Sequence, residues 1–62
     1  MVFWHVVTKF FDSGTVKVNI APIEAESRPK SYMAENATCD EYHDYFNTYP
    51  EAAKYAADAR KA

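Results

Sequence analysis

The chain has 62 residues, with seven Lys and Arg against nine Asp and Glu and a formal net charge of −2 at pH 7. A chain of this length builds one hydrophobic core, so we expect a single domain over residues 1–62. The acidic balance argues against direct nucleic-acid binding, because a phosphate-binding surface needs clustered Lys and Arg to replace counterions.

The first element is a predicted β-hairpin. Residues 2–11 are rich in β-branched and aromatic side chains, with apolar residues at both odd and even positions, which favours a strand. Asp12–Thr15 follows as a turn, with Gly14 where a positive φ is needed. Val16, Val18 and Ile20 then alternate with more polar residues, as in a half-buried strand.

The middle of the chain is predicted to be a loop followed by a third strand. Pro22 ends the regular ladder or confines it to a sheet edge, because proline has no N–H to donate. Residues 24–37 are mostly polar and contain Pro29, so they are expected to form an ordered loop. Residues 38–46 alternate in a way that lets Tyr42 and Phe46 face the core.

The last element is a predicted helix with a clear start. Thr48-Tyr49-Pro50-Glu51 is a capping-box sequence, with Thr48 as the N-cap. Alanines and Tyr55 then recur at helical spacing, and Arg60 and Lys61 complement the helix dipole at the end. The fold class is therefore α+β: an antiparallel hairpin, a third strand, and a C-terminal helix packed on the sheet.

No set of residues predicts an enzyme, a metal centre or a cofactor. Cys39 and His43 lie four residues apart, which on a strand places them about 13 Å apart, too far to share one ion. The carboxylates Asp40, Glu41 and Asp44 are expected to form a solvated acidic edge, since so small a domain does not enclose a catalytic cleft. His5, in the first strand, is expected to be a packed or edge histidine.

The expected location is the cytoplasm. Cys39 is the only cysteine, which fits a reducing compartment better than a secreted disulfide scaffold. We expect no signal peptide, because Met1 is followed by Val2-Phe3-Trp4-His5 rather than a basic segment. No apolar run reaches the length of a membrane span.

An acidic segment rich in tyrosine is the feature on which a functional hypothesis rests. Between Ser31 and Ala53 there are five acidic residues and no Lys or Arg. Carboxylates beside tyrosines can bind a basic protein groove, as in inhibitors that imitate DNA. The alternative is that the aromatic residues are core and the acids are a solubilising face. The candidate partner-binding residues are Glu35, Asp40, Glu41, Tyr42, Asp44 and Tyr45.

A second hypothesis is self-association. The first strand is apolar on both faces, so Phe3, Val7 and Phe11 can be buried against a second copy in a homodimer. A third reading, single-stranded nucleic-acid binding through Trp4 and the phenylalanines, needs a positive groove that the sequence does not predict.

The chain also resembles small uncharacterised proteins of gut bacteria and their mobile elements. The resemblance rests on residues 10–14 in the hairpin, Arg28-Pro29 in the loop, and residues 42–48 leading into Glu51-Ala52. It implies a β-rich domain ending in a helix and brings no catalytic residues. With the acidic segment, it suggests an inhibitor or accessory protein of a phage or mobile element.

Overall fold

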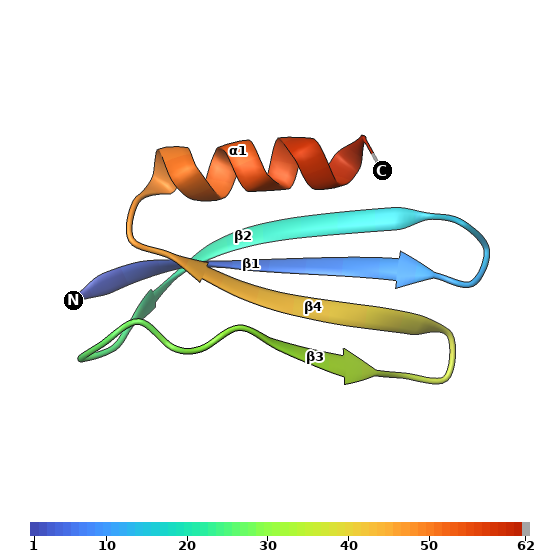
Figure 1. Ribbon diagram of the computed structural model, residues 1–62, viewed down its shortest axis with the longest axis horizontal. Coiled ribbons are helices and arrows are strands. Elements are labelled where there is room, and N and C mark those ends of the chain that lie inside the picture. Colours follow the sequence, from blue (N-terminus) through green and yellow to red (C-terminus); the bar gives the residue numbers. More distant parts are fainter. Residues whose placement is uncertain (62) are drawn as a thin grey trace.

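The computed structural model describes residues 1–61, which form one four-stranded antiparallel sheet and one helix (Figure 1). The α+β prediction is confirmed. The strand order across the sheet is β2-β1-β4-β3, so the two edge strands are joined by the loop between β2 and β3. The elements are β1 (Val2–Phe11), β2 (Val16–Glu24), β3 (Tyr32–Glu35), β4 (Cys39–Phe46) and α1 (Tyr49–Arg60).

The predicted hairpin is formed by β1 and β2, and Pro22 lies inside β2 rather than at its end. Pro22 is opposite Trp4 in the β1–β2 register. The hairpin is closed by hydrogen bonds from Phe11 N to Thr15 O and from Ala25 N to Met1 O. In this pattern the Trp4–Pro22 pair lies between hydrogen-bonded pairs. The Pro22 nitrogen therefore faces the outer edge of the sheet, where no N–H is needed. Gly14, with φ of 91°, takes the left-handed conformation in the turn.

The third predicted strand is confirmed as β4, but the loop prediction for residues 24–37 is wrong at Tyr32–Glu35. These four residues pair with β4 in the register Tyr32–His43 to Glu35–Asp40. The segment has no clear alternation of apolar and polar residues, and its strand conformation comes from hydrogen bonds to β4. β1 pairs with the other edge of β4, which makes β1 and β4 the central strands.

The capping prediction for α1 is also confirmed. Thr48 is the N-cap, with extended backbone, and its side-chain oxygen accepts a hydrogen bond from the Glu51 N–H at 3.4 Å. The Thr48 hydroxyl donates in turn to the Glu51 carboxylate at 2.8 Å. This side-chain contact holds the first turn of the helix where the chain leaves β4.

The helix packs on one face of the sheet, here called the helix side, and leaves the other face uncovered. Figure 1 shows that it runs along β2, far from β3. Val6, Ala52 and Ala56 are fully buried and form the core between the layers. Partly buried residues packed around them are Trp4, Val18, Ile20 and Phe46. Because strand residues alternate between faces, odd-numbered residues of β1 and β4 lie on the opposite, helix-free face.

Candidate functional site

The six candidate partner-binding residues divide between the two faces of the sheet. Asp40, Tyr42 and Asp44 alternate along β4 on the helix side, and Glu35 is the cross-strand partner of Asp40. Glu41 and Tyr45 lie on the helix-free face. The structure therefore brings four of the six together. We call Glu35, Asp40, Tyr42 and Asp44, with the neighbouring Met33, the acidic strip.

The acidic strip is the part of the helix side that α1 does not cover. The helix contacts β2, β1 and β4, and within residues 1–61 it makes no comparable contact with β3 (Figure 1). Met33 is consequently 46% exposed and Tyr42 38% exposed. Tyr42 rests edge-on against Phe10, with ring centroids 5.6 Å apart, which gives this aromatic residue a fixed support.

The carboxylates of the strip are not neutralised by the chain's own cations. Glu35 and Asp40 are exposed, and no Lys or Arg among the described residues forms an ion pair with them. Asp44 is different, because it accepts a hydrogen bond from the Tyr55 hydroxyl of α1 at 2.8 Å. Burial of Tyr55, followed by this hydrogen bond and the charge of Asp44, raises the pKa of Tyr55 to about 12. Asp44 therefore joins the strip to the helix.

On the helix-free face, four rings form a compact group that we call the His–Tyr cluster: His5, Tyr32, His43 and Tyr45. Tyr32 stacks on His43 with centroids 4.3 Å apart, and His5 stacks on Tyr45 at 4.5 Å. The two histidine rings are 5.1 Å apart, so β1, β3 and β4 all contribute to one cluster. Mutual stacking occupies ring faces that would otherwise be free to stack on a nucleic-acid base.

A line of hydrogen bonds runs through this cluster. His5 Nε2 lies 2.9 Å from His43 Nδ1, and His43 Nε2 lies 3.2 Å from Glu41 Oε1. The Asn36 amide donates to the other Glu41 oxygen. Burial, and then the neighbouring His43, lower the pKa of His5, although Asp44 opposes the change. Burial, and then the nearby Tyr32 hydroxyl, raise the pKa of Tyr45.

These contacts hold the two imidazole rings in a fixed orientation. A general base needs a substrate position within hydrogen-bond reach and a matched nucleophile or acid. Two of the depressions at the surface of residues 1–61 are relevant here, and neither is lined by His5 or His43. One, of about 410 Å³, is lined by Val7, Lys9, Lys17, Val18 and Asn19. The other, of about 370 Å³, lies between the β2–β3 loop and the end of β4.

The structure gives no support to a metal site. Among residues 1–61, no group of three or more His, Cys, Asp and Glu side chains is arranged to hold an ion. Cys39 is buried on β4, four positions from His43 along the same strand.

The three residues considered for self-association share the helix-free face, but they differ in access. Phe3 is only 5% exposed and is thus already buried within the chain. Val7 and Phe11 are half-buried. A covering partner would therefore contact Val7, Phe11 and the His–Tyr cluster rather than Phe3.

Comparison with protein-family models, curated proteins and solved structures finds no match for this chain. Within the described residues, no helix has both the length and the apolar character needed to cross a bilayer.

The sequence does not predict the His–Tyr cluster. Its spacing relates His43 only to Cys39 and leaves His5 as an isolated histidine on the first strand. His5 and His43 both lie at odd-numbered positions of predicted strands. This is a weak signal for a shared face, because it depends on how the two strands pair. The diagonal contact between them depends on the β1–β4 register, in which Val7 is opposite His43 and His5 is opposite Tyr45.

Proposed function

We propose that the protein is a non-enzymatic binding module whose acidic strip engages a basic surface of a partner protein. The supporting observation is the exposed pair Met33 and Tyr42, which α1 leaves uncovered beside the unneutralised carboxylates of Glu35 and Asp40. Apolar and aromatic side chains supply buried area at an interface, and rim charges steer a partner of opposite sign. A basic groove on a DNA-binding protein has this complementary chemistry.

An inhibitor role follows from that chemistry. The strip presents carboxylates along one edge of the sheet, as a nucleic acid presents phosphates, so the partner we propose is a nuclease or another DNA-binding protein. A phage or mobile element is the setting that the sequence resemblance suggests for such an inhibitor or accessory protein.

The test uses a charge-reversed variant chosen from the structure. Glu35→Lys with Asp40→Lys reverses two exposed residues and leaves the Asp44–Tyr55 and Glu41–His43 contacts in place. The matched control is Glu26→Lys with Asp58→Lys, which makes the same change in net charge at exposed positions in the loop and on α1. Binding is measured by calorimetry to a basic nuclease, at low and at high salt, and by competition with duplex DNA.

We expect the wild type and the control to bind at low salt, to release at high salt, and to be displaced by DNA. The strip variant is expected to lose at least about tenfold in affinity, the equivalent of about 1.4 kcal/mol. Equal loss in both variants would mean that net charge alone drives the binding, and unchanged affinity in the strip variant would refute the proposal.

Self-association through the helix-free face is the second candidate. It is favoured by the sheet face that α1 leaves open, on which Val7 and Phe11 remain half-buried. A partly apolar sheet face is stabilised when a second layer covers it. The oligomeric state in solution, measured by sedimentation equilibrium, tests this candidate.

A further inference from the structure

Near the C-terminal end of β4, a central strand of the sheet, one strand edge has no hydrogen-bonded partner strand. The bond from Asn36 N to Cys39 O shows that odd-numbered residues of β4 direct their N–H and C=O groups toward β3. The β3–β4 ladder ends at the pair Tyr32–His43, and the next hydrogen-bonded pair in this register is Lys30–Tyr45. No backbone hydrogen bond joins Lys30 to Tyr45, so the Tyr45 N–H and C=O are left without a protein partner among the described residues.

The unpaired main chain of Tyr45 borders a depression. Its volume is about 370 Å³, and its walls are the loop residues 28–31 and the β4 residues 44–46. Three consecutive strand residues line it, which places it at the edge of β4 that faces the loop. This volume is at the lower end of the range for ligand sites and suits one or two amino-acid residues.

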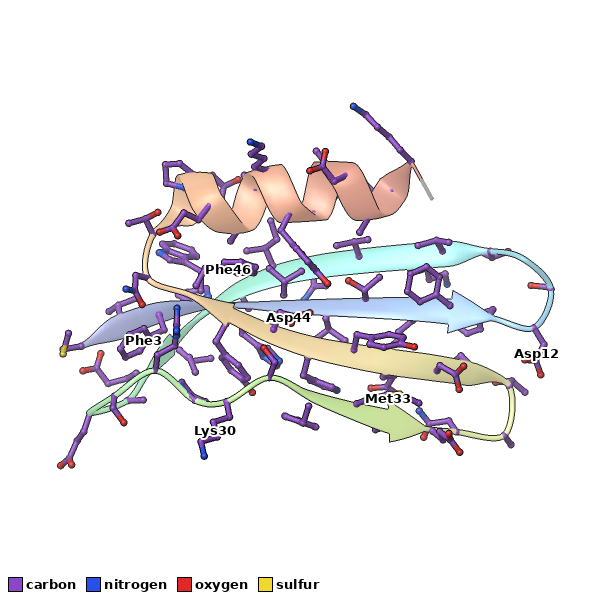
Figure 2. All side chains as sticks on the ribbon, viewed as in Figure 1. Phe3, Asp12, Lys30, Met33, Asp44 and Phe46 are labelled. Carbon is purple, nitrogen blue, oxygen red and sulfur yellow. The ribbon has the colours of Figure 1, made fainter. Side chains whose placement is uncertain are left out.

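Two basic residues, Arg28 and Lys30, line the depression beside the Tyr45 main chain. Arg28 lines the depression and forms no ion pair within residues 1–61. Lys30 also belongs to the loop, but Figure 2 shows its side chain extending away from the sheet. Arg28 and Lys30 both line the depression, with Asp44 on the β4 side, and of the two cations the planar guanidinium of Arg28 is better suited to a carboxylate.

We propose that this depression binds the C-terminal residue of an extended peptide. In an antiparallel ladder, the residue that pairs with Tyr45 gives an N–H to the Tyr45 carbonyl and accepts from the Tyr45 N–H. A C-terminal residue satisfies both groups, because one carboxylate oxygen accepts from Tyr45 and its own N–H donates. The second carboxylate oxygen then remains free for Arg28. Capture of a terminal carboxylate and addition of a strand to a sheet edge are both known modes of peptide recognition.

The depression shares only Asp44 with the acidic strip, and the proposal calls for a different ligand. It is tested by nuclear magnetic resonance titration of the ¹⁵N-labelled protein with N-acetyl-Ala-Ala-Ala, as the free acid and as the C-terminal amide. We expect the free acid to shift the Tyr45 amide resonance and to bind at least about fivefold more tightly than the amide. Equal affinity for the two peptides, or shifts confined to other residues, would overturn the proposal.

Two variants and one small ligand sharpen the test. Arg28→Gln is expected to remove the preference for the free acid, and Lys54→Gln, the same change in charge at an exposed position on α1, to retain it. Equal loss in both variants would contradict the role assigned to Arg28. Sodium acetate, compared with sodium chloride at the same concentration, is expected to bind more weakly than the peptide because it lacks the N–H. An equally strong effect of acetate would show a simple anion site and overturn the assignment to a peptide.

The same experiment distinguishes peptide binding in the depression from binding of a basic partner at the acidic strip. The Glu35→Lys, Asp40→Lys protein keeps the depression intact, so it is expected to bind the peptide as the wild type does. If its peptide binding is retained while its binding to the basic partner is lost, the two sites act independently.

Discussion

His5 and His43 share a hydrogen bond that limits how many protons the pair can carry. A bond between two ring nitrogens 2.9 Å apart needs one donor and one acceptor, so one ring must present an unprotonated nitrogen to the other. Two charged imidazoles would place two N–H groups face to face. Burial of His5 adds to this preference for the neutral ring.

We therefore expect the protein to lose stability as the pH falls below the usual histidine pKa of 6.5. The pKa of His5 is lowered in the folded state, so between the folded and unfolded values the unfolded chain binds more protons. Its contribution to stability is complete above pH 6.5 and is lost as the pH falls toward the folded value. Urea unfolding at pH 7.5 and at pH 5.5 measures the effect.

The control for this pH dependence is His5→Gln, which keeps a polar side chain but cannot titrate. We expect the difference in unfolding free energy between the two pH values to be smaller in this variant than in the wild type. An identical difference in both proteins would assign the pH dependence to the carboxylates instead.

Thr8 is a second residue whose buried side chain is expected to lower the free energy of unfolding. It is only 1% exposed, and its hydroxyl oxygen has no hydrogen-bond partner among the described residues. Thr8→Val keeps the shape of the side chain and removes the buried hydroxyl. We expect the free energy of unfolding to rise by about 1 kcal/mol, as measured by urea denaturation. A fall in stability would show that the hydroxyl is satisfied in solution.

At the scale of elements, small side chains determine how close α1 lies to the sheet. Ala52 and Ala56 are fully buried against Val6, and neither has atoms beyond Cβ to separate the layers. Larger residues such as Trp4 and Phe46 pack at the sides of this contact. The alanine-rich face of the helix was recognised in the sequence, and the structure shows that two of these alanines form the core.

Enlarging one of these alanines is expected to be costly. Ala56→Leu forces a larger side chain into a closed contact, so we expect a loss of about 1–3 kcal/mol in unfolding free energy. Ala57→Leu, one position along at an exposed site, is the matched control and is expected to change stability by less than about 0.5 kcal/mol. Thermal and urea unfolding of both variants measure the difference, and equal effects would contradict the close packing of Ala56.

At the scale of the whole molecule, the sheet has one covered face and one open face. The principal extents are 36 × 22 × 13 Å, so the sheet presents a broad open face on a thin molecule. The charged residues Lys9 and Glu41 are opposite one another on the open face, so it does not carry a single sign of charge. This charge balance suits a second copy related by a two-fold axis.

If the open face self-associates, sedimentation equilibrium at high micromolar concentration should give a mass approaching twice 7.1 kDa. Val7→Lys adds a charge to the middle of that face and is expected to restore the monomer mass. The control is Val2→Lys, an exposed position on the same strand. A constant mass of 7.1 kDa for the wild type would refute self-association and leave the acidic strip as the functional surface.

The sequence by itself determined the local elements of this protein. A glycine turn between alternating apolar runs specifies the β1–β2 hairpin, and the Thr48–Glu51 pair specifies the start of α1, because both depend on residues close in the chain. The missing N–H of Pro22 predicted either the end of the ladder or an edge position, and the structure shows the edge position.

Only the tertiary structure decided which residues meet. β3 exists because β4 offers a free edge, and the packing of α1 on one face decides which acidic residues of β4 lie on the helix side. The His5–His43 contact and the unpaired main chain of Tyr45 depend on registers between strands far apart in the chain. A shift of one residue in either register would move these side chains to the opposite face, and a local pattern does not contain that information.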